Sequence, residues 1–183
     1  MQRKFSSSFR IWHWLQAIAM FGLFITVVLR ESVMHKSQIG SIVKTKLAEI
    51  GTVITDEQAV VIGKAVRSPM WDWHIYLGIA VAILLVWRIA LVIKNGFGFD
   101  ENPHMQKVYK LYKAVYLLLA IMSLSGLTLY WKLAGSAKDT VETVHMYLGW
   151  SLFAFIAVHL IGVVLAEKSD QSGLVSRMIN GAE

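Results

Sequence analysis

The chain has 183 residues, a formal net charge of +6 and no cysteine, with 56% hydrophobic and 16% charged residues. Ordinary soluble domains contain about 45–50% apolar and about 25% charged residues, so this composition indicates a membrane protein. The lack of cysteine excludes disulfides, zinc–thiolate sites, iron–sulfur clusters, cysteine nucleophiles and covalently attached c-type haem. The basic residues lie between apolar blocks, as in the loops of membrane proteins, and do not indicate nucleic-acid binding.

Four apolar stretches approach or exceed the length of about 17–25 residues that a helix needs to cross a bilayer. They are Ile11–Leu29, Ile75–Ile93, Ala114–Trp131 and Met146–Ala166. Each is continuous and lacks the period-two alternation of a membrane β-strand. We therefore expect one all-α membrane domain over residues 1–183, a four-transmembrane-helix bundle with helices near 11–29, 73–93, 108–131 and 144–166.

The first apolar stretch follows basic residues, as a secretory signal does. Its apolar part is too long for a typical signal, however, and Val28–Glu31 offers no small-residue cleavage site. We expect it to be a retained helix that contacts membrane lipid.

Lysine and arginine in the short loops predict the orientation of the chain, because cytoplasmic loops carry an excess of both. One side of the membrane would hold Arg3, Lys4 and Arg10 together with Lys94, Lys107, Lys110 and Lys113. The short loop 132–143 on the other side carries only Lys132 and Lys138. This pattern favours cytoplasmic N- and C-termini.

A long outer loop over residues 30–70 separates the first two spans. Within it, Ile39–Val66 alternates apolar residues with Lys and Glu, a pattern that predicts one or two short amphipathic helices lying on the membrane. The loop is either a plain surface feature or a docking surface for an external partner.

Four histidines fall at the ends of the spans or within them: His13, His74, His145 and His159. His145 and His159 share the last span and are fourteen residues apart. That spacing corresponds to about 21 Å along a helix, and to a rotation roughly 40° short of four turns. Both imidazoles therefore project from nearly the same face, one near each membrane surface.

The other two histidines match these in depth, His74 with His145 and His13 with His159. Two pairs at two levels are what two stacked b-type haems require, with one neutral imidazole on each side of each iron. A single histidine at a helix end is more often an interfacial residue, whereas His159 lies well inside its span, where a polar residue is costly. We expect His35 and His104, which have no partner at matching depth, to be surface residues.

Arg88 is the only charged residue inside the second span and lies fourteen residues after His74. It therefore returns to the depth of His13 and His159. Two interpretations stay open: an arginine that extends its head group to water, or a salt bridge to a propionate of the inner haem. Arg10, one turn before His13, is a second candidate for the propionate.

Small and aromatic residues accompany these positions. Gly78 and Gly149 each lie four residues after a proposed ligand, where glycine either admits a porphyrin ring or allows close helix packing. The tryptophans at span ends indicate an aromatic belt at the membrane surfaces, formed by Trp12, Trp14, Trp71, Trp73 and Trp131.

These motifs resemble the bacterial cytochrome b561 family, whose domain is shared with the cytochrome b subunits of nickel–iron hydrogenases. The matching pieces are Arg-Ile-Trp-His-Trp at 10–14, Trp73-His74, the spacing of His145 and His159, and the tail 173–181. The likeness covers almost the whole chain and departs from the compact members at the long loop 32–70.

The resemblance implies a di-haem protein of the bacterial inner membrane. It would carry respiratory-chain electrons between quinone and a periplasmic redox partner, such as a c-type cytochrome or an oxidoreductase subunit. His74 with His145 would bind the outer haem b, and His13 with His159 the inner one. Quinone would be an exchangeable substrate.

Two alternatives remain beside this electron-transfer subunit. One branch of the family oxidises superoxide at the outer haem and reduces quinone, which would make the chain a stand-alone oxidoreductase; Lys132, Lys138 and Arg67 would attract the anion. The other alternative is a haem-free transporter or metal carrier. The lack of Asp or Glu inside the spans counts against proton-coupled transport.

Overall fold

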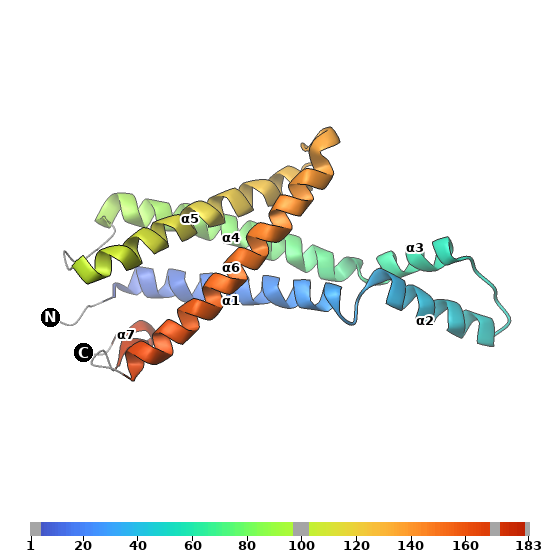
Figure 1. Cartoon of the computed structure of the whole chain (residues 1–183), viewed down its shortest axis with the longest axis horizontal. Helices are drawn as coiled ribbons and strands as arrows, with labels where there is room; N and C mark the ends of the chain where they lie inside the picture. Colours follow the sequence, from blue (N-terminus) through green and yellow to red (C-terminus); the bar gives the residue numbers. More distant parts are fainter. Residues whose placement is uncertain (1–4, 97–102, 169–172, 182–183) are drawn as a thin grey trace. The chain divides into compact units, whose positions relative to one another are not determined.

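The computed structural model describes residues 5–96, 103–168 and 173–181, and every regular element in these ranges is helical (Figure 1). The helices are α1 (Ser7–Glu31), α2 (Lys36–Glu49), α3 (Asp56–Val66), α4 (Ser68–Asn95), α5 (Pro103–Tyr130), the 3-10 helix η1 (Gly135–Ala137), α6 (Lys138–Glu167) and α7 (Leu174–Ile179).

Four of these helices, α1, α4, α5 and α6, are long and apolar enough to cross a membrane. The predicted all-α fold class with four spans is confirmed. The helices begin four to six residues before the predicted positions, because hydropathy marks the lipid-crossing part and misses the polar first turns. Both prolines of the chain lie in such first turns, Pro69 in α4 and Pro103 in α5, where the missing N–H has no helical partner to lose.

The chain divides into two compact units, one of residues 18–78 and one of residues 1–17 with 79–183. Helices α1 and α4 each contribute residues to both units. The organisation as a single domain therefore stays a prediction, and the two units are described separately below.

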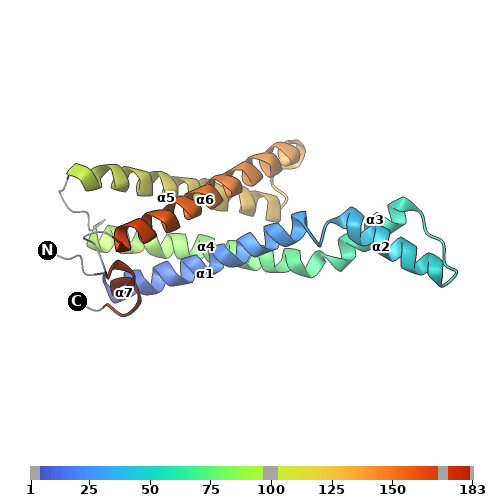
Figure 2. The same ribbon diagram turned by 60° about the horizontal axis from the view of Figure 1, so that its bottom comes forward.

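In the unit of residues 18–78, helices α2 and α3 pack side by side (Figures 1 and 2). Gly40 and Gly63 allow this close approach: a Cβ on Gly40 would lie 2.7 Å from the carbonyl oxygen of Ala59, and one on Gly63 would overlap that of Lys36. The long loop thus contains two short helices whose backbones meet at small residues. We call residues 36–66 the α2–α3 hairpin.

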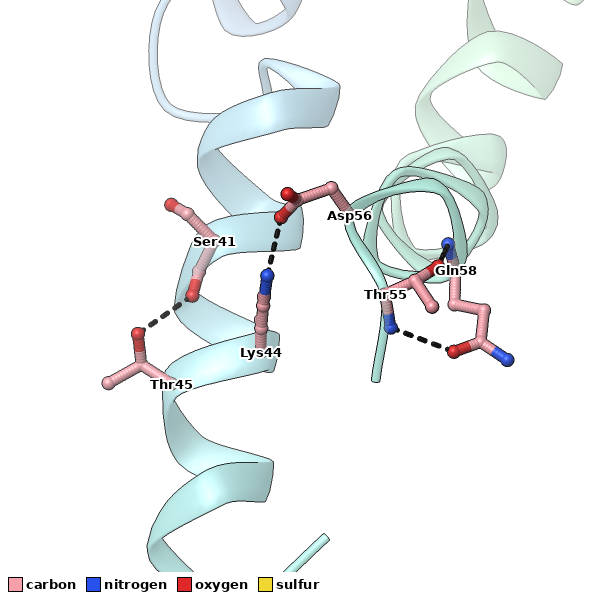
Figure 3. Close-up of polar contacts among 6 residues, drawn as sticks. All are labelled: Ser41, Lys44, Thr45, Thr55, Asp56 and Gln58. Atoms are coloured by element: carbon pink, nitrogen blue, oxygen red, sulfur yellow. Dashed lines mark hydrogen bonds and ion pairs between the residues drawn. The ribbon is translucent and has the colours of Figure 1, made fainter. Parts of the chain in front are cut away.

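Polar contacts mark the start of α3 (Figure 3). The N–H of Gln58 donates to the Thr55 hydroxyl at 3.3 Å, and the N–H of Thr55 donates to Oε1 of Gln58 at 2.9 Å, which forms a capping box. Lys44 of α2 pairs with Asp56 at 2.6 Å. An exposed ion pair of this kind contributes about 0–1 kcal/mol, so the glycine contacts matter more to the hairpin than this pair.

In the other unit, α5 and α6 are neighbours, and α7 packs against the end of α6 (Figure 1). The Glu167 carboxylate accepts the N–H groups of Gly173 at 2.8 Å and of Val175 at 3.2 Å. It satisfies donors at the start of α7 that have no partner within the helix. The sequence-defined tail 173–181 is therefore a short helix held to α6 by a carboxylate.

Candidate haem-ligand histidines

His13 of α1 and His159 of α6 lie close together within one unit. Their ring centroids are 6.3 Å apart and the ring planes are inclined by 56°. The two residues lie far apart in sequence, and the structure brings them together as the match in depth predicts.

The separation fits a single metal ion between the two rings. A histidine nitrogen lies about 2 Å from a bound metal and about 1.1 Å from its own ring centroid, so two opposed imidazoles on one metal have centroids roughly 6.2 Å apart. In addition, His13 Nδ1 is buried and has no hydrogen-bond partner among the residues that the structure describes. The centroid separation is therefore that of two histidines that would hold one haem iron between them.

Aromatic rings surround this pair. The Phe9 ring lies 6.3 Å from the His13 ring, and Phe155 stacks on His159 with centroids 6.0 Å apart and planes inclined by 20°. Each phenylalanine is four residues before its histidine and thus on the same helix face. Such an apolar surrounding restricts access of water, which is one of the factors that set the potential of a metal centre.

Arg88 of α4 lies in the same unit and is only 8% exposed. Its Nε donates to the hydroxyl of Tyr116 at 2.9 Å, and its guanidinium lies over the rings of Phe9 at 4.7 Å and Trp12 at 5.3 Å. The head group is thus held among aromatic side chains and does not extend into water. Because Phe9 also contacts His13, the charge is close to the inner histidine pair; the salt bridge to a propionate stays a prediction.

Trp12 differs from the expected aromatic belt. It is 5% exposed, and its indole N–H donates to the carbonyl oxygen of Leu84 at 2.7 Å. Membrane-surface tryptophans expose their rings to lipid, whereas this one joins α1 to α4 one turn before Arg88. Its position at a span end was therefore a poor guide to its role.

Arg10 lies at the start of α1 and interacts with α7. It donates to the carbonyl oxygen of Ile179 and to the Ser7 hydroxyl, both at 3.2 Å. Trp14 donates to the carbonyl oxygen of Met178 at 3.1 Å. Residues on both sides of His13 thus hold the C-terminal helix, and a role for Arg10 at a propionate stays a prediction.

His145 of α6 is held by a hydroxyl on α5. The Ser125 hydroxyl lies 2.8 Å from His145 Nδ1 and donates its own proton to the carbonyl oxygen of Met122 at 2.9 Å. With the hydroxyl proton on the carbonyl oxygen, the hydroxyl accepts from Nδ1–H and the lone pair of the neutral imidazole is on Nε2; the contact by itself fits either tautomer of the ring. A Cβ on Gly126 would lie 3.1 Å from His145 Cε1, so glycine leaves room for the ring.

His74 has the same kind of partner within the unit of residues 18–78. The Thr26 hydroxyl lies 2.8 Å from His74 Nδ1 and donates to the carbonyl oxygen of Leu23 at 2.6 Å. This arrangement likewise allows Nδ1–H of His74 to donate to the hydroxyl, with the lone pair of the ring on Nε2. Since His74 and His145 belong to different units, their pairing stays a prediction from sequence.

The two remaining histidines take no part in these arrangements. His35 is exposed at the N-cap of α2, as expected for a surface residue. The side chain of His104 lies outside the described part of the chain.

Sequence reasoning missed four residues at these sites: Thr26, Ser125, Tyr116 and Gly126. The available signal was a hydroxyl or a small residue within an apolar span, where polar groups tend to bond to neighbouring helices. Many such residues occur in the spans, and only the packing of the helices shows which of them meet a histidine.

Comparison with known families bears directly on these histidines. The model of the family described as prokaryotic cytochrome b561 matches residues 4–181. The chain belongs to the prokaryotic cytochrome b561 family. No curated protein and no solved structure matches it. As a member of this family with four apolar helices, it is a multi-pass membrane cytochrome of b type that acts in electron transfer.

Proposed function

We propose that this cytochrome b561 binds two haems b and carries electrons across the bacterial inner membrane, between the quinone pool and a periplasmic redox protein. The observation that carries the proposal is the pair of His13 and His159, whose ring centroids are 6.3 Å apart. Family membership supplies the cofactor, since its members bind haem b. Haem iron supplies a one-electron Fe(III)/Fe(II) couple when bound.

At the inner level, His13 and His159 would hold the haem from opposite sides. Arg88, buried beside Phe9, would neutralise a propionate with its planar guanidinium. Tyr116 would keep this guanidinium in place through its hydrogen bond to Nε. Phe9 and Phe155 would exclude water from the ligand pair.

At the outer level, His74 and His145 would hold the second haem. The support is their equal depth in sequence and the hydroxyl 2.8 Å from each Nδ1, an arrangement that suits a lone pair on Nε2. On α6 the two levels are fourteen residues apart, or about 21 Å along the helix. Two centres at this spacing would divide the crossing into shorter electron transfers.

The proposal also covers the orientation of the protein in the membrane and the direction of electron flow. The bias of Lys and Arg toward the N-terminus and the loop 94–113 supports cytoplasmic termini. The α2–α3 hairpin would then be periplasmic. The direction of electron flow between quinone and this partner would follow from the potentials of the two haems.

Ligand substitution tests the two haems separately. His159→Ala should remove the inner haem and His145→Ala the outer one, each leaving one haem per chain by pyridine haemochrome assay. His35→Ala, an exposed histidine, is the matched control and should keep both. If either ligand variant keeps both haems with unchanged spectra, the assignment of the ligands is wrong.

A second experiment decides between an electron-transfer subunit and an oxidase of superoxide. The purified cytochrome in vesicles with quinone would be given either a reduced c-type cytochrome or a steady source of superoxide. Lys138, one of the residues that would attract superoxide, pairs with Glu142 at 3.3 Å. The proposal predicts no rapid quinone reduction by superoxide alone, and rapid reduction would favour the oxidase.

A further inference from the structure

Two hydroxyl groups in the membrane spans form the same hydrogen-bonding arrangement in separate parts of the molecule. Ser125 and Thr26 each donate to the carbonyl oxygen three residues earlier, that of Met122 and of Leu23 respectively. Each then has its oxygen 2.8 Å from the Nδ1 of one histidine. With its proton on the carbonyl oxygen, each hydroxyl is placed to accept from Nδ1–H of its histidine.

His13 differs from His145 and His74 in this respect. The inner ligand His13 has a buried Nδ1 with no hydrogen-bond partner in the described ranges. Thr128 offers a comparison on α5 itself: its hydroxyl donates to the carbonyl oxygen of Leu124 at 2.8 Å, which is the common behaviour of threonine in a helix. Back-bonding alone therefore does not account for two hydroxyls that meet two histidines.

We propose that Thr26 and Ser125 are positioning residues for the outer haem, which fix the tautomer of its two ligands and lower its reduction potential. This inference rests on the proposed function, in which His74 and His145 bind that haem. A hydrogen bond from Nδ1–H to an acceptor orients a ligating imidazole and raises its basicity. A more basic ligand favours ferric over ferrous iron, so the hydroxyls lower the potential of the outer haem and leave the inner haem unaffected.

The proposal differs from a purely structural role. A hydroxyl that only joined two helices would contribute to stability without changing the electronic properties of the iron. A tuning hydroxyl changes the potential and the spectrum of one haem. The two roles can therefore be separated by a measurement on the intact holoprotein.

The test compares Thr26→Val and Ser125→Ala with the control Thr128→Val, which removes a hydroxyl that back-bonds within its own helix. Potentiometric titration should show the potential of one haem shifted upward in the first two variants, and further in the double variant, while the other haem is unchanged. Low-temperature EPR of the ferric protein should show one of the two low-spin signals altered. Thr26→Ser, which restores a hydroxyl, should return the potential toward that of the wild type.

Other outcomes distinguish this inference from the proposed function. If the two variants keep both haems with the potentials and EPR signals of Thr128→Val, the inference is overturned and the di-haem function stands. If Ser125→Ala loses one haem and Ser125→Thr regains it, the positioning role is supported without the titration. A wild-type protein that binds no haem overturns the proposed function, and the inference with it.

Discussion

Gly126 provides a sensitive test of the position of His145, because an added methyl group would press on the imidazole ring. In the Gly126→Ala variant the new Cβ would lie 3.1 Å from His145 Cε1 and 3.7 Å from Nδ1. An ordinary van der Waals contact would be roughly 3.4–4 Å, so the ring must move by a few tenths of an ångström. Ser125 holds the same ring at Nδ1 and opposes that movement.

The expected loss of affinity for the outer haem follows from two opposing contributions to the free energy. Overpacking of this kind costs about 1–3 kcal/mol, whereas replacing glycine by alanine within a helix stabilises it by about 0.5–1 kcal/mol. The net loss is about 0–2.5 kcal/mol, which corresponds to an up to roughly 70-fold weaker hold on the outer haem. Transfer of haem to excess apomyoglobin measures this difference, and only one of the two haems should leave faster.

Gly162→Ala is the matched control for this variant. It makes the same substitution in a helix, and its Cβ would meet no atom of the described chain within 4 Å. Equal haem transfer from both variants would refute the reasoning, since it would mean that the position of the His145 ring does not matter to the haem.

Three further predictions concern other parts of the molecule. Arg88→Met removes a charge near the inner haem and should lower its potential by an amount on the order of tens of millivolts; an unchanged redox titration would contradict the propionate role, and Arg88→Lys should shift less. Trp14→Phe removes the hydrogen bond to Met178, a bond of roughly 0.5–1.5 kcal/mol, so amide exchange in α7 should rise about 2- to 12-fold; protection equal to the wild type would show that α7 is held otherwise. Gly63→Ala forces a Cβ against the backbone of Lys36, at a cost of about 1–3 kcal/mol. Amide exchange in α2 and α3 should become faster while both haems remain bound, and unaltered exchange would argue against close packing at this glycine.

The four spans are well predicted from sequence, because a continuous apolar run of this length is rare outside membrane-crossing helices. The first residues of these helices are poorly predicted, as α4 and α6 show. The two helices begin at Ser68 and Lys138, before the apolar stretch, where only backbone hydrogen bonding defines the start of the helix. The α2–α3 hairpin was expected as one or two helices, but its packing depends on Gly40 and Gly63, whose role requires knowledge of the partner helix.

The candidate ligands could be found from sequence because helix periodicity fixes depth and face together. His145 and His159 share a face by their spacing alone, and the proximity of His13 to His159 agrees with a match in depth. The partners of these histidines could not be found in this way. Whether Ser125 meets His145 depends on the rotation of α5 against α6, which periodicity within one helix does not determine.

The surroundings of Arg88 and Trp12 also could not be predicted from the sequence. Sequence left open whether Arg88 extends to water or stays inside, and its aromatic surroundings come from α1 and α5, distant in the chain. Trp12 was expected at the membrane surface because of its position at a span end. Its burial against α4 depends on which side of α1 faces the protein.

All of the proposals above depend on two b-type haems, each bound between two histidines. A reduced-minus-oxidised visible spectrum of the detergent-purified protein, with haem counted per chain, measures this number. We expect two low-spin b-type haems per chain. A single haem would contradict one of the two histidine pairs, and a colourless protein would contradict the whole assignment of the ligands.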